Sequence, residues 1–194
     1  AGNEDYEITF RVERDFDGGS FSNRRIIAMQ QDKPIFNMAA SFHTLSEGLS
    51  HQNRMPDVPP PEELRNGDDI MREAMAGRPD AARFLERYRP IDYRPVDQAN
   101  WSRRGKQEAL QHIWFRTVAP LPDDPGLHRA ILTYASDSYL LGTCCMPHAV
   151  SWMSPGFTSA SLDHAVWLHD DFRADDWLLY SCDSPWAGRD RGFN

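Results

Sequence analysis

The chain has few cysteines and no long apolar run, and both absences narrow its class. Of its 194 residues three are cysteines, Cys144 and Cys145 side by side and Cys182 alone. An odd number without regular spacing is not a disulfide framework and indicates a reducing compartment. No apolar stretch approaches the ~18 residues of a membrane span. No signal peptide is visible, but the first residue is Ala1 rather than methionine, so a processed N-terminus could hide one.

Positive charge is also scarce. The chain has 21 Lys and Arg against 29 Asp and Glu, which gives a net charge of −8. This balance argues against nucleic acid or an anionic membrane surface as the main partner, although a few local arginines could still hold a small polyanion. Hydrophobic residues make up 40% of the chain, enough for a globular protein with one large domain or two small ones.

The first of three predicted parts is an antiparallel meander over residues 1–45. Apolar and polar residues alternate from Tyr6 to Val12, which is typical of a strand with one buried face. Asp17-Gly18-Gly19 predicts a turn, and further strands are expected over residues 20–30 and 35–42. A meander this short needs something to pack against.

The second and third parts are a linker and a larger domain. Residues 46–89 contain three consecutive prolines and two charged helix candidates, near 62–76 and 80–87, so we expect a solvated linker without chemistry of its own. Residues 90–194 predict strands near 110–118, 159–169 and 177–182, with one helix before the last two. This order favours an α+β domain whose antiparallel sheet wraps around one helix.

The expected helix, over residues 124–144, carries the first candidate catalytic residue. Asp124 is a good N-cap, and Pro125 suits the first helical position. Asp137 shares a small apolar face of this helix with no positive partner. An unpaired buried carboxylate costs several kcal/mol or has its pKa raised, so such groups are rarely kept for packing alone. We interpret Asp137 and Ser161, a hydroxyl at the start of an expected strand, as parts of a hydrolytic site; a capping or solvent-facing role for Asp137 is the alternative.

Other reactive groups suggest weaker alternatives. Cys144-Cys145 followed by His148 resembles a nucleophile and its base, but adjacent cysteines near a helix end are more often core residues. His164 and His169 are five apart and face opposite sides of an expected strand, so they cannot share a metal ion there. We expect no metal and no cofactor. A ligand-lining or structural role suits His164 better.

Several segments together resemble one family, the type II (TesB-like) acyl-CoA thioesterases, which contain two fused hotdog domains. The segments are Gly19-Ser20-Phe21-Ser22-Asn23-Arg24-Arg25, Lys33-Pro34-Ile35-Phe36, Ala40-Ser41-Phe42, His51-Gln52, Met55-Pro56, Tyr134-Ala135-Ser136-Asp137, Ser161-Leu162-Asp163-His164, Trp167, His169, Trp177-Leu178-Leu179-Tyr180 and Arg191-Gly192. Their order and spacing fit over nearly the whole chain.

The resemblance implies a double hotdog, in which each antiparallel sheet wraps around a central α-helix. It also implies a catalytic aspartate, matched by Asp137, a Thr or Ser before an Asp-His pair, matched by Ser161, and a late glutamine. That glutamine, the last strands and the first central helix have no counterpart here, so we expect an internal segment of a longer protein. Arg24, Arg25 and Arg191, with Arg103 and Arg104, are candidates for the phosphates of coenzyme A, and His164 for lining the substrate.

The expected reaction is hydrolysis of an acyl-CoA to a fatty acid and coenzyme A. A thiol with a pKa of ~8.5 leaves without a strong acid. The site must therefore supply a base such as Asp137, a hydroxyl such as Ser161 to hold the water, and donors for the oxyanion. An inactive acyl-CoA-binding or interaction module is the alternative, and a dehydratase on the same fold a weaker one. The resemblance also implies a homo-oligomer, a dimer of double hotdogs, in the cytoplasm or, in a eukaryote, the peroxisome.

Overall fold

A computed structural model describes residues 2–77, 89–99, 105–151 and 154–194. The chain forms two compact units, Ala1–Met55 and Pro56–Asn194. The predicted division at residues 45 and 89 stays a prediction.

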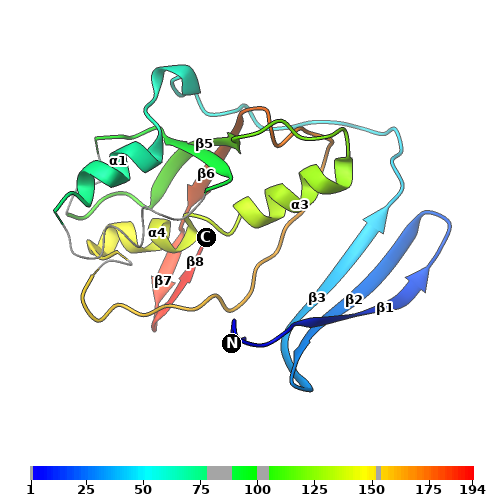
Figure 1. Ribbon diagram of the computed structural model, residues 1–194. Helices are drawn as coiled ribbons and strands as arrows, with labels where there is room; N and C mark the ends of the chain where they lie inside the picture. The colour runs from blue at the N-terminus through cyan, green and yellow to red at the C-terminus, as the bar shows by residue number, and fades with distance from the viewer. Residues whose placement is uncertain (1, 78–88, 100–104, 152–153) are drawn as a thin grey trace. The chain divides into compact units, whose positions relative to one another are not determined.

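The first unit is the predicted three-stranded meander (Figure 1). β1 (Thr9–Asp17), β2 (Phe21–Gln30) and β3 (Lys33–His43) pair antiparallel in chain order. Gln31 and Asp32, with φ of 48° and 61°, form the tight turn between the last two strands. Such left-handed backbone is typical of two-residue hairpin turns.

Apolar side chains of this sheet stay largely exposed. The register places Val12 opposite Ile26 and Ile26 opposite Met38, so one face of the sheet carries a row of apolar side chains. Among the described residues of this unit only Ala28 and Gln30 are buried. The meander thus forms from hairpin pairing, without a core of its own.

The second unit is built on a separate three-stranded antiparallel sheet. β4 (Ile91–Pro95), β5 (Leu110–Thr117) and β6 (Leu178–Asp183) pair in that order. The strands predicted over 110–118 and 177–182 are confirmed to within a residue at each end. A small hairpin of β7 (Trp186–Gly188) and β8 (Arg191–Phe193) follows.

The predicted helix begins as expected but is interrupted. α3 (Pro125–Ala135) starts at Asp124, whose carboxylate accepts hydrogen bonds from the backbone N–H groups of Gly126 and Leu127 at 2.9 and 3.4 Å. The prediction of one continuous helix to residue 144 is wrong. α4 (Leu140–Cys145) begins only after Tyr139, whose φ of 71° breaks the helical hydrogen-bond ladder. At this break the Tyr139 ring packs edge-on against Tyr93, with ring centroids 5.0 Å apart.

The core of the unit lies between α3 and one face of its sheet. Ile91, Phe115 and Ala135 are buried together. Four partly buried side chains pack against them, from β4, α3 and β6: Tyr93, Leu132, Leu178 and Tyr180. A helix on one face of an antiparallel sheet is the predicted α+β arrangement (Figure 1).

The other face of this sheet is contacted by part of the predicted linker. η1 (Pro61–Glu63) lies close to β4, since Arg94 donates from Nη1 to the Pro61 carbonyl at 2.8 Å. The Trp114 indole donates to the Pro59 carbonyl at 2.9 Å. Met75, at the end of α1 (Gly67–Ala74), is fully buried. For residues 59–75 the interpretation as a merely solvated linker is therefore wrong, because backbone carbonyls and buried apolar side chains of this part pack in the second unit. The other helix candidate, near 80–87, lies outside the described residues.

The strand predicted over residues 159–169 does not form. This stretch has no regular secondary structure and is mostly exposed. Side chains hold the residues that follow it to α3: Arg129 pairs with Asp171 at 2.5 Å, and the His128 ring accepts from the Ala174 backbone N–H at 3.0 Å. Alternation in the sequence shows which side chains share a face, but a strand also needs a neighbouring edge to pair with.

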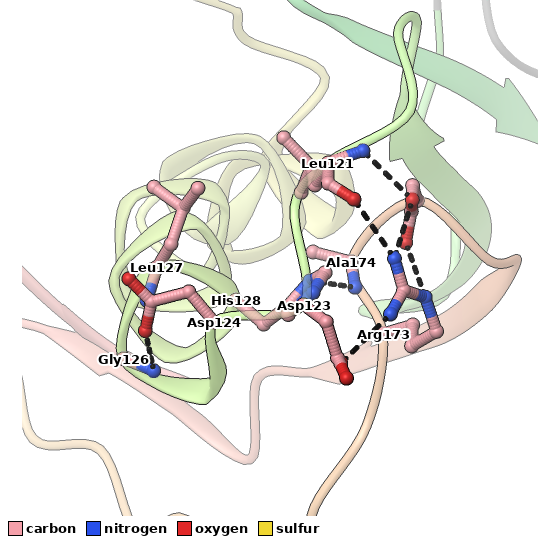
Figure 2. A network of polar contacts seen from close by, with 9 residues as sticks. Leu121, Asp123, Asp124, Gly126, Leu127, His128, Arg173 and Ala174 are labelled. Carbon is pink, nitrogen blue, oxygen red and sulfur yellow. Dashed lines mark hydrogen bonds and ion pairs between the residues drawn. The ribbon is translucent and has the colours of Figure 1, made fainter.

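A polar network fixes the far end of this connection at the start of α3 (Figure 2). The Arg173 guanidinium donates from Nε and Nη2 to both carboxylate oxygens of Asp175, each at 3.0 Å. It also donates to the Leu121 carbonyl at 3.0 Å, and the Leu121 N–H donates to Asp175 at 2.9 Å. Asp123 pairs with the same guanidinium at 3.2 Å. These contacts join residues 121–123, just before α3, to residues 173–175, just before β6.

In the part of the chain that the structure describes, no helix is long and apolar enough to cross a membrane.

Candidate active site

Asp137 lies in the turn between α3 and α4, and its side chain is exposed. The prediction that it sits in a buried helical face is wrong, because α3 ends two residues earlier and the backbone then turns. Asp137 is therefore not the unpaired buried carboxylate that the sequence predicts. Its candidacy depends instead on what surrounds this turn.

Two tyrosines of the sheet hold the turn. The Tyr180 hydroxyl on β6 donates to the Ser136 carbonyl at 2.6 Å, and the Tyr93 hydroxyl on β4 bonds with the Ser138 hydroxyl at 3.0 Å. Burial raises the pKa of both tyrosines. For Tyr180 the nearby Cys182 thiol and Asp137 carboxylate raise the pKa further, so its hydroxyl stays a proton donor at neutral pH. Asp137 is thus anchored next to the sheet at its backbone while its carboxylate stays open to solvent.

The structure brings His164 to this turn. Its Nε2 lies 2.8 Å from the Ser136 hydroxyl, across 28 residues of sequence. Ser161, three residues before His164, is exposed on the same irregular segment. This contact therefore brings the two predicted catalytic residues toward each other. Asp137 is adjacent to Ser136, and Ser161 is three residues from His164. Ser136 and Tyr180 stand within the motifs quoted from the sequence, but the sequence predicts no role for them or for Tyr93, because nothing in their spacing shows which residues meet.

The predicted phosphate-binding arginines are distributed over both units. In the first unit Arg24 pairs with Asp17 at 2.5 Å and Arg25 pairs with Glu13, so both are engaged with acids. In the second unit Arg191 is exposed on β8. The other two candidates, Arg103 and Arg104, lie outside the described residues. Their contact with coenzyme A stays a prediction.

The thiols are poor candidates for a nucleophile. Cys145 and Cys182 are buried, and burial raises the pKa of each to about 11. A thiol with so high a pKa is almost fully protonated at neutral pH. Cys144 donates its S–H to the Leu141 carbonyl at 3.2 Å. Within the described ranges no group of three or more His, Cys, Asp or Glu could hold a metal ion.

An apolar pocket of about 370 Å³ lies beside α3. Ala130, Ile131 and Tyr134 line it from the helix, and the ends of β4 and β5 and the segment after β5 supply the rest: Pro90, Ile91, Thr117, Val118, Ala119 and Leu121. Tyr134 precedes Asp137 by three residues, which is less than one helical turn. The volume lies at the lower end of the range for small-molecule sites.

Comparison with known proteins identifies the family of this chain. Residues 84–194 match the family model described as acyl-CoA thioesterase, and the chain belongs to this family. The chain is 37% identical over 201 residues to acyl-coenzyme A thioesterase 8 of Homo sapiens, an alignment of 99% of this chain and 62% of that protein. It is 29% identical to acyl-CoA thioesterase 2 of Haemophilus influenzae, over 98% of this chain and 67% of that protein.

Solved structures agree with the sequence relatives. The crystal structure of acyl-CoA thioesterase II TesB2 from Mycobacterium marinum superposes with a TM-score of 0.74 at 42% identity, over 94% of this chain and 63% of that one. The tesB protein of Mycobacterium avium subsp. paratuberculosis shares the fold, with a TM-score of 0.72 at 24% identity, over 97% of this chain and 63% of that one. The fold is the α+β hotdog fold of this family. The chain spans less than two thirds of the length of the human relative and of both structures.

Proposed function

We propose that this chain carries out the hydrolysis of acyl-CoA thioesters. The observation that carries the proposal is that the matched family region, residues 84–194, contains Asp137, Ser161 and His164. The contact between Ser136 and His164 supports a shared site for these three residues. The resemblance to thioesterases gives the substrate class.

In the proposed reaction the Asp137 carboxylate accepts a proton from a water molecule. The water oxygen attacks the thioester carbonyl carbon, and the carbonyl oxygen becomes an oxyanion. The Ser161 hydroxyl holds the water, and backbone N–H groups or the same hydroxyl stabilise the oxyanion. The intermediate then collapses, the C–S bond breaks, and coenzyme A leaves as a thiolate that takes the proton back from Asp137, which restores the carboxylate. The exposed carboxylate suits a reaction in which water must reach the base.

The apolar pocket beside α3 supports a place for the acyl chain. Tyr134 lines this pocket and stands three residues before Asp137, and on this spacing we place the thioester of a bound acyl chain near the carboxylate. Arg24, Arg25 and Arg191 stay candidates for the coenzyme A phosphates, and His164 for lining the substrate. We also propose a homo-oligomer, a dimer of double hotdogs, in the cytoplasm or a peroxisome. Light scattering tests the oligomer.

The test is release of free coenzyme A thiol from an acyl-CoA by a purified protein that contains this chain. Ser161→Ala should lower turnover, but less than the loss of Asp137 does, because water can partly replace one hydroxyl. Ser161→Thr keeps a hydroxyl and should keep turnover. Saturable binding of acyl-CoA without thiol release would favour the inactive binding module instead. Equal turnover of Ser161→Ala and the unsubstituted protein would remove Ser161 from the site.

A further inference from the structure

The contact between Ser136 and His164 has a defined hydrogen-bond direction. The Ser136 hydroxyl oxygen lies 2.9 Å from the Thr133 carbonyl and 2.8 Å from His164 Nε2. A hydroxyl has one proton to donate, and a carbonyl oxygen can only accept. Both contacts are satisfied together when the Ser136 proton goes to the Thr133 carbonyl and His164 donates from Nε2–H to the serine oxygen, and we assign the tautomer of His164 on this basis.

This direction excludes one role and favours another. A histidine that donates to a serine cannot at the same time remove that serine's proton, so the pair is not a nucleophile with its base. The donor is present in the Nε2–H form of neutral histidine and in the protonated ring alike. The contact is thus suited to holding two segments together whatever the charge on His164.

Among the described residues, few side-chain interactions hold the segment that contains His164. Residues 158–169 have no regular secondary structure, and Leu162 and Trp167 are 78% and 75% exposed. Further along the described chain, the ion pair of Arg129 and Asp171 also connects to α3, seven residues beyond His164. Ser136 is adjacent to Asp137, and three residues of chain span at most ~11 Å, so the contact limits how far Ser161 can move from Asp137.

We propose that Ser136 is a positioning residue that, through His164, holds the Ser161 segment beside Asp137. We call the Ser136–His164 contact the clamp. This inference rests on the proposed function, because it assigns the clamp to the same reaction. Ser136 itself need not touch the substrate or the water. Its hydroxyl also bonds to the Thr133 carbonyl at the end of α3, and this bond fixes the helical side of the clamp.

One pair of variants tests the clamp by activity. Ser136→Ala removes the acceptor and His164→Ala the donor, and each should lower kcat for decanoyl-CoA by roughly three- to tenfold, the range of a single hydrogen bond. The double variant should have a kcat no lower than that of the less active single variant, because both substitutions break the same contact. KM should change in His164→Ala but little in Ser136→Ala. Ser136→Thr and His164→Gln keep an acceptor and a donor and should restore most of kcat.

A second readout does not depend on hydrolysis. Chymotrypsin cleaves after Leu and Trp, so cleavage at Leu162 and Trp167 reports how freely the segment moves. We expect cleavage there to be several times faster in Ser136→Ala and normal again in Ser136→Thr. Ser159→Ala, an exposed serine of the same segment, is the matched control and should change neither readout.

The two readouts separate the possible failures. Unchanged cleavage in both Ser136→Ala and His164→Ala would overturn the clamp. Faster cleavage with unchanged kcat would overturn the positioning role while leaving the proposed function intact. No thiol release by the unsubstituted protein would overturn the proposed function and, with it, the assignment of the clamp to this reaction; cleavage would still report the contact itself.

Discussion

The two units of the chain use similar strands but differ in what covers them. In residues 2–55, as the structure describes them, a three-stranded meander carries apolar side chains that are largely exposed. In the second unit a sheet of the same size has α3 on one face and the segment around η1 on the other. Strand pairing alone thus arranges the backbone, while a helix is needed to bury the side chains. The candidate site lies where that helix ends.

The largest expected effect comes from matched phenylalanines in the two sheets. Phe115 is 3% exposed and Phe10 is 61% exposed. Phe115→Ala should lower the free energy of unfolding by about 3–5 kcal/mol, because it leaves a cavity under α3. Phe10→Ala should change it by no more than about 0.5 kcal/mol. Urea unfolding followed by circular dichroism measures both, and equal losses would show that the first sheet also has a covered core.

A methionine pair tests whether the segment before β4 belongs to the second unit. Met75 is 1% exposed, whereas Met38 of the first unit is 42% exposed. We expect Met75→Ala to cost about 2–5 kcal/mol and Met38→Ala to have a much smaller effect. All six tryptophans lie after residue 100, so their fluorescence reports the unfolding of the second unit. An unchanged urea midpoint in Met75→Ala would show that this segment is a solvated linker and does not contribute to the core of the second unit.

Sequence patterns predicted those elements whose signals are local. Alternation and turn residues located the meander, short apolar runs located β5 and β6, and the Asp124-Pro125 pair located the start of α3, because each of these signals depends on neighbouring residues. The break at Tyr139 was not predicted, since the residue carries no glycine-like signal for left-handed backbone and the apolar spacing continues across it.

The candidate site was predictable only in part, because its contacts join residues that are far apart in the sequence. The motifs singled out Asp137, Ser161 and His164, but the link between the last of these and Ser136 joins residues 28 apart. Burial of Asp137 was inferred from a helix that ends before it. The strand expected around Ser161 would need a pairing edge, and alternation contains no information about one.

Acid should weaken the second unit through the network at the start of α3. The pKa of Asp175 is lowered from 3.8 to about 2. The largest cause is the hydrogen bond from the Arg173 side chain, and the hydrogen bond from the Leu121 N–H adds to it. A lowered folded-state pKa stabilises the fold above the unfolded pKa, so the contribution is complete above about pH 4 and is lost as the pH falls through about 2. Thermal unfolding followed by tryptophan fluorescence should show this loss.

The control for this pH effect is available in the first unit. Asp175→Asn should remove the loss between pH 4 and pH 2, while Asp17→Asn, which breaks the exposed pair with Arg24, should leave the fluorescence transition unchanged. An Asp175→Asn protein with the same acid sensitivity as the unsubstituted one would show that other carboxylates control the acid response of this unit.

The most direct test of the account is Asp137→Asn in a purified protein that contains this chain, assayed by release of coenzyme A thiol. The side chain is exposed, so the fold should be unaffected, and circular dichroism checks this. Loss of a general base should lower kcat roughly 10²–10⁴-fold. Asp190→Asn, an exposed aspartate in the turn before β8, should keep full turnover. Near-normal hydrolysis by Asp137→Asn would contradict the central claim that this carboxylate at the end of α3 activates the water.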